Sequence, residues 1–167
     1  RWGDPTTIEP PPLAEELQLD FTDRGTMDML QDFRRCYVDH AGEDGIRLAP
    51  DESNRDPYFT INYRNLLEGY TAEDYPYLEL TYMVPESCAR DRYNMELFLC
   101  SGSVSHATAG ISAFVELVAD GEWHHVVVDL GRTGFWSGDI YSIRMDFFSA
   151  CETGDRMYLK EFKLLNE

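Results

Sequence analysis

Aromatic and planar polar side chains give this chain its clearest potential for chemistry, since it has ten Tyr and three Trp among 167 residues. An aromatic ring can stack on the C–H face of a pyranose, and an arginine or carboxylate can make paired hydrogen bonds to neighbouring hydroxyl groups. This combination indicates a sugar-binding site. The candidate ligand-binding residues are tyrosines outside clear core positions and one Arg-x-Asp pair: Tyr58, Tyr63, Tyr70, Tyr75, Tyr93, Arg144 and Asp146. The alternatives are that the rings pack inside the protein and that Arg144 and Asp146 form a structural ion pair.

Catalytic patterns are weak in this sequence. A retaining glycosidase needs two carboxyl groups about 5 Å apart, and no expected strand carries a suitable carboxylate cluster. Glu96 and Glu116 lie on successive expected strands and are the residues that an enzyme of this kind would use. His124 and His125 are adjacent on one strand, so they point to opposite faces. No G-x-S-x-G, H-E-x-x-H or glycine-rich phosphate loop is present. We therefore predict that the domain is not an enzyme.

The charge balance excludes two classes of partner. The chain has 14 Lys and Arg against 31 Asp and Glu, a formal net charge of −17. Such a surface repels phosphate backbones and anionic lipid headgroups, so we expect neither nucleic acid binding nor membrane insertion. No run of about 18 apolar residues is present.

Short apolar runs separated by Gly, Pro and Asp predict an antiparallel sheet protein. Residues 17–21 alternate apolar and polar side chains and are expected to form the first strand, whereas residues 22–43 predict a long excursion with one helical turn. The further expected strands are 46–49, 58–63, 77–84, 94–100, 112–118, 123–130, 140–148 and 157–165. About nine short strands at near-regular spacing predict an all-β fold, a jelly-roll β-sandwich of two antiparallel sheets.

Alternation within the strands predicts which face of each is buried. The expected core positions are Leu78, Leu80, Tyr82 and Val84, then Val126, Val128 and Leu130, and finally Tyr141, Ile143, Met145 and Phe147. The side chains expected to face away from the core are His125, Val127 and Asp129 on one strand and Ser142, Arg144 and Asp146 on another. If those two strands lie in one sheet, their outer faces form the floor of a groove.

The first 16 residues predict a separate linker. Residues 1–12 contain four prolines and favour an extended, stiff conformation. We therefore divide the chain into a proline-rich linker at 1–16 and a single monomeric module at 17–167 that was cut from a longer protein. The four cysteines, at positions 36, 88, 100 and 151, lack metal or redox spacing, and the sequence leaves free thiols and disulfides equally open.

The last third of the chain carries a family resemblance. It contains W-x-x-V-x-V-D-L at 123–130, W-x-G at 136–138, I-x-x-I-R-x-D at 140–146 and a final strand at 157–164. This order resembles the C-terminal part of the jelly-roll modules that accompany catalytic domains in bacterial carbohydrate-active and cell-surface proteins. The resemblance covers residues 112–165 well and the front half only by strand rhythm. In it, Trp123 and Trp136 occupy positions that anchor the packing.

The resemblance implies a non-catalytic carbohydrate-binding module. Such a module targets a multimodular extracellular bacterial protein to a polysaccharide, so the expected partners are a glycan and neighbouring modules of the same polypeptide. The expected location is secreted or cell-surface. The main alternative is a structural or protein-interaction β-sandwich module, and the second is a glycoside-active enzyme domain.

The resemblance also raises the question of a structural calcium ion, which many modules of this kind hold between the first and last strands. The nearest carboxylates are Asp20, Asp23, Asp155 and Glu161. However, Lys160 stands where the family-like final strand often has an aspartate, and its charge would oppose a cation there. The sequence therefore identifies no cofactor and leaves a structural calcium ion as a possibility.

Overall fold

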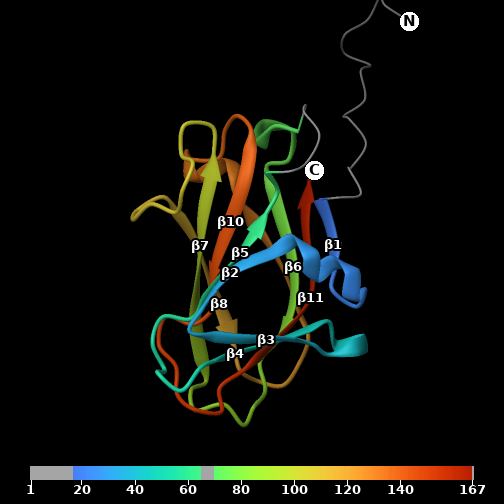
Figure 1. Ribbon diagram of the computed structural model, residues 1–167, viewed down its shortest axis with the longest axis vertical. Coiled ribbons are helices and arrows are strands. Elements are labelled where there is room, and N and C mark those ends of the chain that lie inside the picture. The colour runs from blue at the N-terminus through green and yellow to red at the C-terminus, as the bar shows by residue number, and fades with distance from the viewer. Residues whose placement is uncertain (1–16, 65–69, 167) are drawn as a thin grey trace, which may run out of the picture.

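The computed structural model describes residues 17–64 and 70–166, which form two antiparallel sheets. The six-stranded sheet has the order β3 (Cys36–His40), β4 (Ile46–Pro50), β11 (Met157–Leu165), β6 (Tyr77–Met83) and β9 (His124–Asp129), and β1 (Gln18–Asp20) also pairs with β11. The five-stranded sheet has the order β2 (Leu30–Arg34), β5 (Tyr58–Asn62), β10 (Ile140–Asp146), β7 (Arg92–Ser101) and β8 (Ser112–Val118). The two sheets face each other (Figure 1). The predicted all-β sandwich is confirmed.

Every expected strand corresponds to an observed one, but residues 22–43 hold more structure than predicted. This segment contains the 3₁₀ helices η3 (Arg24–Met29) and η4 (Gly42–Asp44) as well as strands β2 and β3. The pattern hid β2 because its register with β5 shifts, and Asp32 and Arg35 have positive φ angles of 54° and 52°. β3 lacks a clear alternation of apolar and polar residues because it lies at a sheet edge with both faces partly exposed. Two more 3₁₀ turns, η5 (Ala72–Asp74) and η6 (Gly131–Thr133), lie in later loops.

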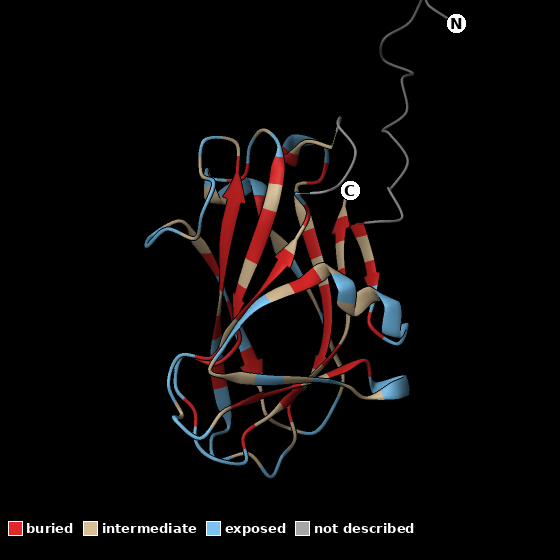
Figure 2. Ribbon diagram, in the orientation of Figure 1, coloured by how far each residue is buried: buried red, intermediate tan, exposed pale blue. Residues whose placement is uncertain are grey.

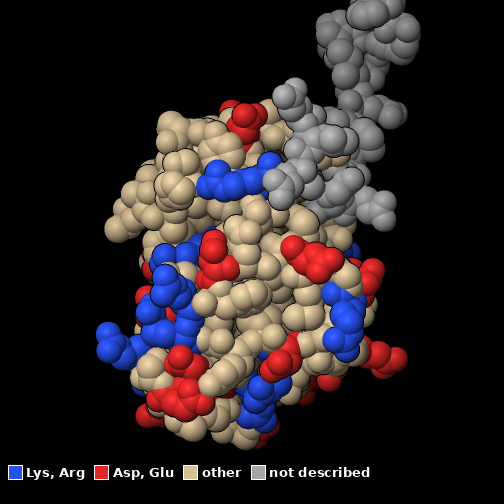
Figure 3. Space-filling model, viewed as in Figure 1, with Lys and Arg blue, Asp and Glu red and all other residues tan. Residues whose placement is uncertain are grey.

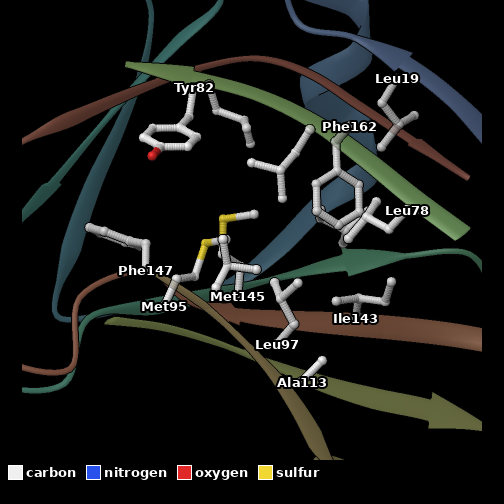
Figure 4. Close-up of a cluster of buried hydrophobic side chains, with 14 of the residues drawn as sticks. Leu19, Leu78, Tyr82, Met95, Leu97, Ala113, Ile143, Met145, Phe147 and Phe162 are labelled. Atoms are coloured by element: carbon white, nitrogen blue, oxygen red, sulfur yellow. The ribbon is translucent and has the colours of Figure 1, made fainter. Parts of the chain in front are cut away.

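Apolar side chains from both sheets meet in one core (Figure 2). The predicted inward faces of β6 and β10 are confirmed, with Leu78, Leu80, Tyr82 and Val84 and then Ile143, Met145 and Phe147 buried. Figure 4 shows Met95, Leu97 and Met145 of the five-stranded sheet on one side of this cluster, and Leu78 and Phe162 of the other sheet opposite them. Tyr141, which was also predicted to lie inside, is half-buried, and its ring contacts the guanidinium of Arg64. The register of β10 with β7 shifts at this point, between Ile140 and Ser142.

The strand pairing settles which outer faces lie together. β9 belongs to the six-stranded sheet and β10 to the five-stranded sheet, so the condition for a groove built from both strands is not met. His125 and Arg144 therefore lie on different sheets, and only the outer face of β10 contributes to the groove described below.

All four cysteines are free thiols. Cys100 and Cys151 are buried, and Cys36 and Cys88 are half-buried. Burial raises the pKa of Cys36 to about 11. The predicted linker at 1–16 lies outside the described residues. Within the described residues, no helix is long and apolar enough to cross a membrane.

Candidate ligand-binding groove

A groove of about 450 Å³ lies over the outer face of the five-stranded sheet. Strand alternation builds its floor, because Phe59 and Ile61 point into the core while Tyr58 and Thr60 point outward. The loop between β7 and β8 forms one wall. The lining residues are Gln31, Asp32, Arg34, Tyr58, Thr60, Arg64, Cys100, Ser105, His106, Ala107, Ser142 and Arg144.

Arg144 is the central residue of the groove floor. Its guanidinium carbon lies 3.9 Å from the ring centroid of Tyr58 and 4.4 Å from that of Phe98. The two rings come from the strands on either side of β10, since Arg144 is opposite Thr60 on β5 and Phe98 on β7. A guanidinium held between two aromatic rings is attracted by both π faces and loses mobility. We call Tyr58, Arg144 and Phe98 the central stack.

Asp146 fixes the orientation of Arg144. The Nε and Nη2 atoms of Arg144 donate to the two carboxylate oxygens of Asp146 at 2.8 and 2.9 Å. Burial raises the pKa of Asp146 to about 6, although the hydrogen bonds and charge of Arg144 act to lower it. Burial also acts to lower the pKa of Arg144, but the hydrogen bonds and charge of Asp146 outweigh this and leave it raised. Arg144 thus stays charged at neutral pH, and its Nη1 atom donates to no group within residues 17–64 and 70–166.

The outer face continues past the central stack to the edge strand β8. Phe114 on β8 is 68% exposed and lies opposite Glu96 on β7. Glu96 accepts a hydrogen bond from the Ser112 hydroxyl at 2.6 Å, and Glu116 forms an ion pair with Arg92. Both glutamates considered for catalysis therefore lie on this outer face, and each is engaged by a neighbouring side chain.

Three of the five candidate tyrosines are buried, and their predicted exposure is wrong. Tyr63, Tyr75 and Tyr93 are 1%, 2% and 3% exposed, so their rings cannot stack on a ligand. Tyr63 continues the inward alternation of Phe59 and Ile61, and that spacing was readable in the sequence.

Of the other two buried rings, Tyr93 lies near the start of β7, and Tyr75 lies in the loop before β6. Tyr93 packs on Phe148 with ring centroids 4.4 Å apart, and its hydroxyl accepts from the Arg90 amide. The backbone carbonyl of Tyr75 accepts from the indole of buried Trp136 at 2.9 Å. Tyr70 is half-buried, meets Tyr75 edge-on and is not among the groove-lining residues. Of the predicted ligand-binding set, the structure brings together Tyr58, Arg144 and Asp146.

Sequence reasoning missed several residues of the groove. Gln31 and Arg34 lie on β2, which had no alternation signal, and Ser105 and His106 lie in a loop. Phe98 had a readable signal, because Met95, Leu97 and Leu99 alternate inward and leave an aromatic ring facing outward between them.

The four candidate calcium ligands do not gather into one site. Asp20 and Glu161 are register partners on β1 and β11, but the Asp20 carboxylate accepts from the amide and hydroxyl of Thr22, and Glu161 pairs with Lys163 at 3.2 Å. Asp23 caps η3 by accepting from the Gly25 amide.

Asp155 is buried elsewhere and accepts from the backbone amides of Ala89 and Glu152. Among the described residues, no group of three or more His, Cys, Asp or Glu side chains is arranged to hold a metal ion. These four carboxylates therefore do not form the shared cation site for which the sequence made them candidates.

No family model and no curated protein sequence matches this chain. Among solved structures, a family 28 carbohydrate-binding module specific for non-crystalline cellulose matches with a TM-score of 0.54 and 12% identity, over 92% of this chain and 96% of its own. A family 11 carbohydrate-binding module from Clostridium thermocellum, in complex with a β-1,3-1,4-mixed-linked tetrasaccharide, matches with a TM-score of 0.45 and 11% identity, over 80% of this chain and 82% of its own.

A glycoside hydrolase domain, Endo-D from Streptococcus pneumoniae R6, matches over 82% of this chain with a TM-score of 0.47 and 12% identity. This chain spans 20% of that domain. The match to the family 28 module, which covers nearly all of both chains, confirms at the level of fold the resemblance noted in the sequence. The chain has the β-sandwich fold found in bacterial carbohydrate-binding modules.

Proposed function

We propose that this protein is a non-catalytic carbohydrate-binding module that holds a polysaccharide in the groove on the outer face of its five-stranded sheet. The observation that carries the proposal is that Tyr58 and the fixed guanidinium of Arg144 lie together in the lining of an open groove. The sandwich fold that it shares with the family 28 module supports this assignment.

The groove offers both kinds of contact that a sugar needs. The partly exposed ring of Tyr58 supplies apolar surface for the C–H face of a pyranose, and Arg144 supplies hydrogen-bond donors beside it. Gln31 and Asn62 flank the stack, with the Asn62 amide donating to the Gln31 carbonyl oxygen at 3.1 Å. These amides leave further donors and acceptors for sugar hydroxyl groups.

The geometry favours a chain that runs across the strands. Tyr58 and Arg144 in the groove lie on β5 and β10, and the exposed Phe114 beyond the groove lies on β8, with β7 between β10 and β8. Neighbouring strands are about 4.8 Å apart, so this row extends over roughly 14 Å. That length exceeds one sugar ring, and the ligand class that it suits is a polymer.

The binding role also fits a location outside the cell and attachment to other modules of a longer polypeptide. An open groove gives each site modest affinity, and attachment to neighbouring modules of a longer extracellular polypeptide raises the effective concentration of sites at the polysaccharide. We therefore place the protein outside the cell as a targeting module, with chemistry left to its neighbours.

Affinity gel electrophoresis against soluble plant and host polysaccharides tests the proposal. We expect selective retardation by at least one glycan, and an approximately tenfold weaker interaction for Tyr58→Ala. Tyr37→Ala is the matched control, because Tyr37 is 48% exposed but lies on β3 of the other sheet. Absence of retardation by every glycan, or equal weakening by the two variants, would reject the groove as a binding site and favour a structural module.

A further inference from the structure

Basic residues outnumber acidic residues in the groove, whereas acidic residues outnumber basic ones in the whole protein. The chain has 14 Lys and Arg against 31 Asp and Glu, yet the groove is lined by three arginines and one aspartate. Figure 3 shows one face of the molecule, on which the largest visible group of Lys and Arg atoms lies on the side of the five-stranded sheet. Arginines thus outnumber carboxylates among the residues that line the groove.

Arg64 is held in position at one wall of the groove. Its guanidinium stacks 5.0 Å from the ring centroid of Tyr141 and donates to the backbone carbonyl of Ser105. The Tyr141 hydroxyl in turn donates to the carbonyl of Gly102, which ties the ring to the same loop. These contacts reduce the conformational entropy that Arg64 would lose on binding a ligand, and they use only part of its donor set.

Arg34 is the second basic group of the groove. It is exposed on β2 and lines the groove. No ion pair joins Arg34 or Arg64 to a carboxylate within residues 17–64 and 70–166. Arg144, by contrast, is paired with Asp146 and adds little net charge. His106 adds an imidazole beside Arg64's loop partner Ser105.

The one lining carboxylate does not cancel this charge. Asp32 lies beside Gln31, whose amide donates to it at 3.5 Å, and it forms no ion pair with any described side chain. Arg34 and Arg64 together therefore exceed Asp32 by one positive charge, in a protein whose formal net charge is −17. Planar guanidinium groups match the two oxygens of a carboxylate or the oxygens of a sulfate ester, through paired charge-assisted hydrogen bonds.

We propose that the groove selects an acidic polysaccharide, with Arg34 and Arg64 binding the uronate carboxylates or sulfate esters of the chain while the central stack contacts its sugar rings. This inference rests on the proposed carbohydrate-binding function and specifies its ligand class. The overall negative charge strengthens the selection, because it disfavours the binding of acidic polymers to the carboxylate-rich parts of the surface.

The test uses ligands that differ only in charge. Isothermal titration calorimetry would compare oligogalacturonides as the free acid, ionised at neutral pH, with the same chains after methyl esterification. It would also compare dextran sulfate with unsulfated dextran, and would include neutral mixed-linked β-glucan. We expect the wild-type protein to bind the free acid or the sulfate ester at least about tenfold more tightly than the corresponding uncharged chain. The arm that binds identifies the acidic group.

Variants then locate the selectivity in the groove. The double variant Arg34→Gln/Arg64→Gln should lose most of the preference for charge while still unfolding cooperatively on heating. Arg24→Gln/Arg132→Gln is the charge-matched control, because both arginines are exposed, on η3 and η6, and neither lines the groove. It should bind as the wild type does.

The outcomes separate this inference from the function on which it rests. Equal or tighter binding of the neutral glucan or the esterified chain would overturn the acidic preference and leave the carbohydrate-binding function standing. An acidic preference that survives in the double variant would also overturn the assignment to Arg34 and Arg64. Failure of all charged and neutral glycans to bind would remove the proposed function itself.

Discussion

Replacing Arg144 with Met should destabilise the protein in a pH-dependent way. Methionine keeps an unbranched side chain between Tyr58 and Phe98, but it leaves Asp146 without its two charge-assisted hydrogen bonds. The Asp146 side chain is only 9% exposed, so water cannot fully replace the lost partner. Removing one member of a buried ion pair costs about 3–5 kcal/mol, and the 23% exposure of Arg144 places this case at roughly 2–4 kcal/mol at pH 8.

The pH dependence follows from the raised pKa of Asp146. The carboxyl group has a pKa of about 6 in the folded protein against an ordinary value of 3.8, so its ionisation lowers wild-type stability as the pH rises from about 4 to 6. Without the guanidinium, which acts to lower this pKa, the loss on ionisation becomes larger. The deficit of Arg144→Met relative to wild type should therefore grow as the pH rises through 6, and it should fall below about 1 kcal/mol at pH 4.5.

Urea denaturation of both proteins at pH 4.5, 6 and 8 measures this difference. The double variant Arg144→Met/Asp146→Asn removes the unpaired charge and should recover at least half of the loss at pH 8. A cost of Arg144→Met below about 0.5 kcal/mol at pH 8, or an equal cost at all three pH values, would refute the reasoning, because either result would mean that Asp146 is well solvated without its partner.

Three further predictions concern the framework that supports the groove. Gly45→Ala should lower the free energy of unfolding by more than about 3 kcal/mol, because φ is +80° and a Cβ atom would lie 2.1 Å from the Leu159 carbonyl oxygen; thermal unfolding measures this, and an unchanged melting temperature would contradict it. Tyr63→Phe should stabilise the protein by about 1 kcal/mol in urea denaturation, because the buried hydroxyl has no hydrogen-bond partner among the described residues, whereas a loss of stability would reveal one. Cys36 should react with iodoacetamide much more slowly at pH 8 in the folded protein than in urea, because burial raises its pKa to about 11, and equal rates would show that the thiol is accessible and ionised.

The sequence by itself determined the strands that carry a clear two-residue alternation, and with them the fold class. The inward sets on β6 and β10 were predictable because a one-residue shift would place every apolar side chain of those strands in water. The same alternation placed Arg144 and Asp146 on an outer face. The alternation also predicts that Tyr63 is buried, because it continues the inward series of its strand. It predicts that Phe98 lies on the outer side of its strand, between the inward residues Leu97 and Leu99.

Only the tertiary structure decided which outer faces lie together. Strand order depends on packing between segments far apart in the chain, so β9 and β10 could not be assigned to different sheets from local patterns. For the same reason the sequence did not reveal that β2 brings Arg34 to the groove or that the Ser105 loop folds back onto Arg64. The concentration of positive charge in an acidic protein arises from these long-range contacts, because a sum of charges along a chain contains no information on where the side chains meet.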